Sequence, residues 1–220
     1  MNFSPQLPFD FSVSKDFTFS NFLTSDKNAE LVGLLEKFET YQEVVAFIWG
    51  KKGAGKSHLL QAICRAKEEV GALQALYLPL QKIKIFGPEV FKSLHHMDLI
   101  CLDDFDCIVG AKEWEESLFE FFNRCREEGV KLLVSSENSP RGLSFDLQDL
   151  ASRMSWGVIY QLHELNDDEK MTALDLRAKE RHLPLSEEVM LYIYNRHSRD
   201  LQSLLEVVDR LDQLSLAEKR

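Results

Sequence analysis

The hydrophobic positions divide the chain into two parts. Up to about residue 165, short apolar runs alternate with longer segments in which apolar residues recur at helical spacing. Beyond that point only helical patterns remain. The runs are rich in β-branched and aromatic residues, a composition typical of strands buried on both faces of a parallel sheet. We therefore expect an α/β region followed by a small, all-helical one.

Strands alternating with helices predict βαβ units, which produce a parallel sheet with helices on both faces. The expected strands cover residues 44–49, 75–80, 98–102, 131–135 and 158–162. The expected helices cover residues 27–41, 57–70, 113–128, 167–181, 186–196 and 199–214. The predicted fold is thus α/β, with a parallel five-stranded sheet and a small C-terminal helical lid. Its expected divisions are an extended arm (1–20), an α/β domain (21–165) and the lid (166–220).

The charge balance weighs against nucleic acid as the main partner. The chain has 26 basic and 36 acidic residues, a net charge of −10 and a pI near 5.1. Proteins that bind duplex DNA without sequence readout need a basic surface that displaces counterions. We expect protein partners, with DNA contact at most indirect or weak.

Two further features of the sequence concern the cellular location. The sequence has no apolar run of membrane-spanning length and no secretory signal pattern. Its four cysteines form no C-x-x-C pair, so they do not suggest a disulfide framework. We expect a cytoplasmic protein that does not enter a membrane.

The strongest chemical signal follows the first expected strand. It reads Gly50-Lys51-Lys52-Gly53-Ala54-Gly55-Lys56-Ser57 and satisfies the pattern G-x-x-x-x-G-K-S. In such a P-loop, the backbone from Gly50 through Gly53, Ala54 and Gly55 turns its N–H groups toward phosphate, and the helix N-terminus adds partial positive charge. Lys56 is expected to reach the β- and γ-phosphates, and Ser57 to bind Mg²⁺. The predicted ligand is ADP or ATP with Mg²⁺.

Two carboxylates end the third expected strand. Asp103 and Asp104 follow the run Leu99-Ile100-Cys101-Leu102. A carboxylate at this edge of the sheet, beside a P-loop, can hold Mg²⁺ through water, and we assign that role to Asp103. Asp104 is a candidate for orienting the attacking water. The alternative, that both residues only cap a turn, stays open.

These motifs, in this order, resemble the AAA+ P-loop NTPases, and several segments resemble the bacterial initiator DnaA within them. Thr18-Phe19-Ser20-Asn21-Phe22, followed by Asn28, is similar to the segment that lines the adenine pocket of that family. Ser57-His58-Leu59-Leu60 is similar to its P-loop helix. The resemblance implies that Phe22 and His58 contact the nucleotide. Glu137 stands in the sensor 1 segment, where the family has an aspartate.

Two arginines acquire roles only through this resemblance. Leu150-Ala151-Ser152-Arg153-Met154-Ser155-Trp156-Gly157 resembles the arginine-finger segment of the DnaA family. The likeness implies that Arg153 contacts nucleotide held by a neighbouring subunit, whereas Arg153 would otherwise be read as half of a surface salt bridge. Ser198-Arg199-Asp200-Leu201 resembles the sensor 2 motif of the lid, which implies that Arg199 lies near the bound phosphates.

The N-terminal arm departs from the DnaA pattern. Gln6-Leu7-Pro8-Phe9-Asp10-Phe11 is similar to short motifs that bind the bacterial sliding clamp. Gln6 would supply an amide hydrogen bond, and Leu7, Phe9 and Phe11 would fill apolar pockets from an extended segment. The sequence ends just after the lid, so the C-terminal DNA-binding domain of the initiator is expected to be absent. This combination resembles DnaA-homologous regulators of replication.

The resemblance implies a negative regulator of the initiation of bacterial chromosome replication. The arm would bind the sliding clamp, the β subunit of DNA polymerase III, and Arg153 would stimulate hydrolysis of DnaA-bound ATP. Its own ATPase activity would be weak or absent, and self-association is left open. One alternative is a helicase-loader-like AAA+ ATPase that binds single-stranded DNA. The other is a nucleotide-supported adaptor that places partners without hydrolysis.

Overall fold

A parallel sheet forms the centre of the larger part of the molecule. The computed structural model describes residues 16–71, 73–94, 97–198 and 200–218. The strands are β1 (Val45–Trp49), β2 (Ala75–Pro79), β3 (Leu99–Asp103), β4 (Lys131–Ser136) and β5 (Val158–Gln161). Their spatial order is β2-β3-β4-β1-β5 and all pairs are parallel. The expected five-stranded parallel sheet is confirmed.

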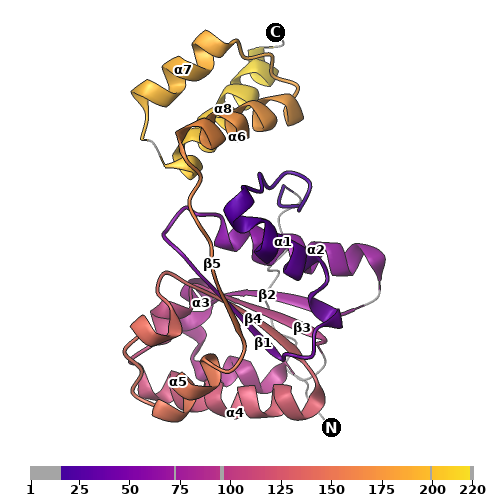
Figure 1. Ribbon diagram of the computed structural model, residues 1–220, viewed down its shortest axis with the longest axis vertical. Helices are drawn as coiled ribbons and strands as arrows, with labels where there is room; N and C mark the ends of the chain where they lie inside the picture. The colour runs from indigo at the N-terminus through magenta and orange to yellow at the C-terminus, as the bar shows by residue number, and fades with distance from the viewer. Residues whose placement is uncertain (1–15, 72, 95–96, 199, 219–220) are drawn as a thin grey trace.

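Helices cover both faces of this sheet (Figure 1). One face carries α1 (Ala29–Glu36) and α2 (Lys56–Val70). The opposite face carries α3 (Leu80–Ile83), α4 (Lys112–Glu128) and α5 (Gln148–Met154). Successive residues of β1 belong to these two cores in turn, because neighbouring side chains of a strand point to opposite faces. This double burial explains why the central strands read as continuous apolar runs.

Short 3₁₀ turns replace or interrupt helices at several places where the sequence is less regular. They are η1 (Asp26–Asn28), η2 (Phe38–Thr40), η3 (Lys84–Phe86), η4 (Pro88–Ser93), η5 (Phe105–Ile108) and η6 (Pro140–Gly142). The single helix expected over 27–41 was wrong, because α1 ends at Glu36 and Lys37 leaves helical geometry at φ −120°. The segment between β2 and β3 was given no element and contains α3, η3 and η4.

The C-terminal part is a three-helix lid with its own apolar core. It consists of α6 (Asp167–Glu180), α7 (Glu187–Arg196) and α8 (Leu201–Glu218). Asn166 and Glu169 form a capping box at the start of α6. Even α8, at 18 residues the longest of the described helices, is not apolar enough to cross a membrane, and neither is any other of them. The expected helical lid is confirmed, although α8 begins two residues later than predicted.

Two ion pairs connect the loops near the lid. Lys51, at the tip of the P-loop, pairs with Glu164 at 2.6 Å, just before α6 begins. Arg181, just after α6 ends, pairs with Asp16 at 3.3 Å. The lid lies at one end of the molecule, on the side of α1 and α2 (Figure 1), and it approaches the N-terminal segment formed by residues 16–26. The lid is therefore next to the P-loop region and away from α4 and α5.

Candidate nucleotide-binding site

The P-loop connects β1 to α2, and glycine is required at its different positions for different structural reasons. Gly53 and Gly55 have φ angles of 81° and 103°, in the left-handed region that favours glycine. A Cβ on Gly55 would also lie 2.8 Å from the ring of Phe22. A Cβ on Gly50 would overlap the carbonyl oxygen of Leu162 at the end of β5. Gly50 is thus required by sheet packing, while Gly53 and Gly55 shape the loop.

Lys56 begins α2 and is buried beneath this loop. Its ammonium group donates to the carbonyl oxygen of Gly50 at 2.7 Å and to that of Lys51 at 3.0 Å. Burial lowers the pKa of Lys56, while the carboxylates of Glu137 and Asp103 act in the opposite direction. The cation thus lies inside the loop, where phosphate oxygens would replace its backbone acceptors.

Asp103 and Ser57, the expected Mg²⁺ ligands, meet at the hydroxyl of Tyr77. This hydroxyl donates to Asp103 Oδ2 at 2.6 Å and also hydrogen-bonds with the Ser57 side chain. The Ser135 hydroxyl donates to the other oxygen of Asp103. Burial raises the pKa of Tyr77 strongly, and Asp103 adds to the effect, so the phenol stays protonated. Two oxygen donors of the kind Mg²⁺ prefers are thus brought to one point.

Asp104 adopts a left-handed conformation, with φ 57°, which aspartate tolerates better than most residues. Its N–H donates to Ser135 Oγ at 3.2 Å. Partial burial of the carboxyl and the neighbouring charge of Asp103 raise the pKa of Asp104. Lys56 acts on the pKa of Asp104 in the opposite direction, so the carboxyl lies within reach of the charge of the P-loop lysine.

Asp106 is a residue of this site that the sequence analysis missed. Its carboxylate accepts hydrogen bonds from the Ser136 hydroxyl at 2.7 Å and from the Glu137 N–H at 2.8 Å. It also accepts from the N–H of Asn138 at 3.4 Å. Asp106 therefore holds the sensor 1 segment after β4 against the turn after β3. The available signal was a lone acidic residue in the apolar stretch 105–108.

Phe22, in the N-terminal segment, packs against His58, which lies in the first turn of α2. The Phe22 ring meets the His58 ring edge-on at 5.2 Å between centroids, and the Phe17 ring lies 4.9 Å from it. His58 Nε2 is 2.8 Å from the carbonyl oxygen of Thr18. Burial lowers the pKa of His58, which favours the neutral ring. Both residues therefore attach the N-terminal segment to the first turn of α2.

A cavity of about 270 Å³ lies between this N-terminal segment and the lid. Residues 23–26 line one side, and Asn166, Asp168, Glu169 and Thr172 of the α6 start line the other. The buried Ser25 hydroxyl, on this lining, has no hydrogen-bond partner in the described residues. A buried hydroxyl without a partner, such as that of Ser25, is expected where a cavity receives a polar ligand.

Arg153 lies on the other face of the sheet, in the last turn of α5. Its guanidinium carbon is 4.1 Å from the ring centroid of Trp156 and 5.7 Å and 5.9 Å from those of Phe119 and Phe122. Within the described residues, its buried Nη1 atom has no hydrogen-bond partner and the side chain forms no ion pair. The surface salt bridge considered for Arg153 is absent from that part of the chain.

The remaining expected site residues cannot be placed. The structure does not describe Gln6, Leu7, Phe9, Phe11 and Arg199.

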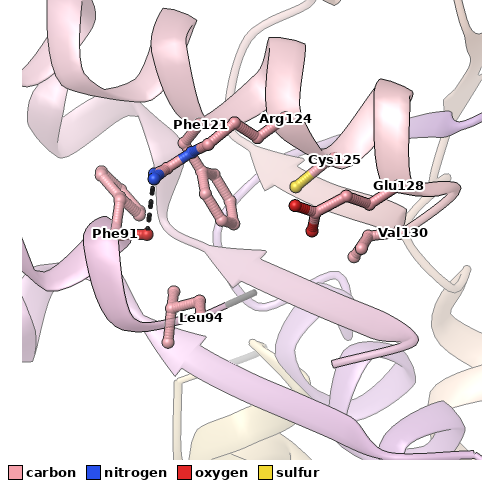
Figure 2. Close-up of a pocket in the computed structure, with 7 residues that line it drawn as sticks. All are labelled: Phe91, Leu94, Phe121, Arg124, Cys125, Glu128 and Val130. Carbon is pink, nitrogen blue, oxygen red and sulfur yellow. Dashed lines mark hydrogen bonds between the residues drawn. The ribbon is translucent and has the colours of Figure 1, made fainter. Parts of the chain in front are cut away.

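The second cavity lies between η4 and α4. Its volume is about 10 Å³, which is room for one water at most (Figure 2). Arg124 lines it and donates to the carbonyl oxygen of Phe91 at 3.2 Å. The described residues contain no group of three or more histidine, cysteine or acidic side chains arranged to hold a metal.

Comparison with solved structures supports the AAA+ fold. Domain III of the replication initiation protein DnaA from Thermotoga maritima superposes with a TM-score of 0.80 at 22% identity, covering 94% of this chain and 92% of that one. AMPPCP-bound DnaA from Aquifex aeolicus gives 0.73 at 23% identity, covering 93% and 67%. The initiator DnaA bound to AMPPCP and single-stranded DNA gives 0.72 at 23% identity, covering 94% and 69%.

Family models match both parts of the chain. The model described as the bacterial DnaA ATPase domain matches residues 13–161, more than half of the chain. A second model, described as the lid domain of Hda, matches residues 167–220. The resemblance drawn from the P-loop, the carboxylate pair and the Arg153 segment is thereby confirmed. This chain belongs to the DnaA ATPase-domain family of AAA+ proteins and carries an Hda-type lid.

Proposed function

We propose that this chain is a nucleotide-bound regulator of the initiator DnaA, and that Arg153 stimulates hydrolysis of ATP held by DnaA. The observation that carries the proposal is the state of Arg153. Its guanidinium lies over an exposed tryptophan ring, on the sheet face opposite the P-loop helix of the same chain, and its Nη1 atom has no partner among the described residues. A cation so placed is suited to an acceptor on another molecule.

Family membership indicates what that acceptor is. DnaA-type ATPase domains bind nucleotide at a P-loop, and an arginine supplied by a neighbouring molecule stabilises charge that develops on the transferred phosphoryl group. Such arginines contribute roughly 10³- to 10⁵-fold to the rate of hydrolysis. The acceptor we propose for Arg153 is the triphosphate of DnaA-bound ATP.

The chain's own P-loop serves a different purpose in this proposal. Lys56 and the loop backbone bind the phosphates of ADP or ATP, and Ser57 and Asp103 hold Mg²⁺, which neutralises phosphate charge when it is bound. The bound nucleotide stabilises the arrangement of the α/β part with the lid. Glu137, in place of the usual aspartate, and the raised pKa of Asp104 support weak or absent turnover at this site.

The N-terminal arm gives the regulator its location. Residues 6–11 would bind the sliding clamp, so that the chain acts where clamps are loaded on replicated DNA. Gln6→Ala combined with Leu7→Ala should abolish capture by purified clamp while nucleotide binding persists. Clamp capture that survives this double change would remove the arm from the proposal.

The central experiment measures ATP hydrolysis by purified DnaA with and without this chain and DNA-loaded clamp. Wild-type chain should stimulate hydrolysis, and Arg153→Ala should abolish the stimulation while clamp binding and nucleotide binding stay intact. Arg126→Ala is the matched control, because Arg126 is a neighbouring cation of the same face. Normal stimulation by Arg153→Ala would eliminate the mechanism.

The same assay separates the alternatives. Complex formation without turnover of DnaA-bound ATP would identify a placement adaptor. Tight, strongly salt-dependent binding of single-stranded DNA, with no effect on DnaA, would identify a helicase-loader-like ATPase.

A further inference from the structure

Three aromatic rings surround the guanidinium of Arg153, and they differ in exposure. Phe122 is buried, Phe119 is half-buried, and Trp156 exposes 58% of its surface. The Trp156 ring is also the nearest of the three, at 4.1 Å from the guanidinium carbon. A planar guanidinium at this distance stacks on the indole and is attracted by the negative face of the ring. Trp156 thus forms the outer wall of the arginine site.

The backbone holds Trp156 in this position from both sides. The Trp156 N–H donates to the carbonyl oxygen of Arg153 at 3.1 Å, which fixes the turn that ends α5. The next residue, Gly157, lies so close to β1 that a Cβ would overlap the carbonyl oxygen of Val45. The indole is therefore a platform anchored to the sheet, although most of its surface faces solvent.

This platform restricts an otherwise flexible side chain. A free arginine has many rotamers, and fixing them on docking reduces the rate gain from a transition-state contact. Here the three rings enclose the guanidinium in one arrangement, while its buried Nη1 group has no acceptor in the part of the chain that the structure describes. The three rings accept no ordinary hydrogen bond from the guanidinium. No such bond to them therefore has to break when the guanidinium binds a phosphate.

We infer that Trp156 is a positioning residue that stacks on Arg153 and holds its guanidinium oriented for a phosphate on a partner molecule. The inference rests on the proposed function of Arg153. It extends that function by assigning the orientation of the arginine to a residue that does not itself contact the reacting phosphate.

The chain offers controls that separate stacking from simple packing. Trp156→Phe keeps an aromatic face for Arg153. Trp156→Leu keeps an apolar side chain on the same surface but removes the aromatic face. Arg126, whose guanidinium lies 5.8 Å from the Trp156 ring, is an exposed cation on α4 that approaches the same ring without the enclosing phenylalanines.

The first test measures stimulated hydrolysis of DnaA-bound ATP over a range of concentrations of this chain. Trp156→Leu should lower the maximal rate about 10- to 100-fold, because small displacements of a catalytic group have effects of this size. The concentration for half-maximal stimulation should change less than about threefold, and Trp156→Phe should recover most of the rate. An unchanged or faster rate for Trp156→Leu, or a loss confined to the half-maximal concentration, would overturn the inference.

The second test uses tryptophan fluorescence of the free chain and needs no partner. The spectrum of the chain minus that of Trp156→Phe isolates the emission of Trp156 from that of Trp49 and Trp114. Arg153→Ala should uncover the indole and increase its quenching by acrylamide, whereas Arg126→Ala should change it much less. Equal quenching with and without the Arg153 side chain would show that the guanidinium does not cover the Trp156 indole in solution.

The two failures are distinguishable. If Arg153→Ala abolishes stimulation but Trp156→Leu does not reduce it, the proposed function stands and the positioning role is wrong. If Arg153→Ala stimulates normally, the proposed function fails, whatever the fluorescence shows.

Discussion

Lys56 and Arg153 are both expected to contact phosphate, yet their surroundings differ. Lys56 is buried at the start of α2 and satisfies its hydrogen bonds with two carbonyl groups of its own loop. Arg153 is held by aromatic faces, which accept no ordinary hydrogen bond, and among the residues that the structure describes its Nη1 atom has no partner. Within the described parts of the chain, Lys56 thus has acceptors from its own loop, whereas the Nη1 atom of Arg153 has none.

The two residues also belong to different parts of the α/β fold. The Lys56 region combines side chains from β2, β3 and α2 at one edge, together with the segment after β4. The Arg153 region is formed by α4, α5 and the turn before β5, on the opposite face. Two phosphate-directed cations on opposite faces cannot easily serve one nucleotide. The structure therefore separates a candidate nucleotide site from the region around Arg153, which is the outward-facing site of the proposal.

The largest expected effect concerns the anchor of the outward-facing site. Gly157→Ala would force a methyl group onto the backbone of β1, so we expect a loss of about 3 kcal/mol in unfolding free energy. Thermal unfolding should show a Tm lower by roughly 6–12 °C. Gly33→Ala is the control, because Gly33 is exposed in α1 and a Cβ added there would meet no atom within 4 Å among the described residues outside its own helix. Equal Tm values for the two variants would mean that the Arg153 region is not anchored to the sheet.

Lys56→Ala tests whether nucleotide binding depends on Lys56 and not on Arg153. The loss of a charged donor at phosphate should weaken nucleotide affinity roughly 10- to 100-fold in calorimetric titration. Lys51→Ala, at an exposed position of the same loop, should have little effect. Arg153→Ala should leave the affinity unchanged, and a loss like that of Lys56→Ala would break the separation of the two sites.

The buried His58 should make the unfolding free energy of the chain depend on pH. Burial lowers the pKa of His58 in the folded chain, so below about pH 6.5 the unfolded chain binds more protons. Stability should therefore fall as the pH drops, by at most about 1.4 kcal/mol per pH unit from this group. Urea unfolding of wild type and His58→Gln between about pH 7.5 and 5.5 isolates the contribution. Parallel curves for the two proteins would contradict the assignment.

The smallest effect is expected at Asp104. The pKa of Asp104 is raised, so its charge is unfavourable, and asparagine tolerates the same left-handed backbone. Asp104→Asn should stabilise the chain by less than about 1 kcal/mol, since solvent screens the exposed carboxylate. The gain in Tm should disappear as the pH falls through the raised pKa. Asp106→Asn should instead destabilise, because Asp106 accepts hydrogen bonds from three residues.

The sequence by itself determined the five strands, the phosphate loop and most of the longer helices, but it gave no element to the stretches that form α3 and α5. The P-loop is a local pattern, because its glycines, lysine and helix start lie within eight consecutive residues. Strand positions were equally readable, since burial on both faces leaves an unbroken apolar run. The break at Lys37 was not readable, because the apolar spacing continues past the point where packing ends α1.

Only the tertiary structure decided what surrounds each functional residue. Tyr77 reads as one more apolar residue of β2, yet its hydroxyl joins Ser57 to Asp103 because parallel strands end at the same edge. Asp106 acquires its role from a segment some 30 residues away. Arg153 reads from the residues alone as half of a surface salt bridge, and its aromatic surroundings appear only when α4 supplies two rings and the turn after α5 supplies Trp156. The physical reason is that side-chain environments come from long-range packing, whereas helix starts, loops and strand burial leave local patterns.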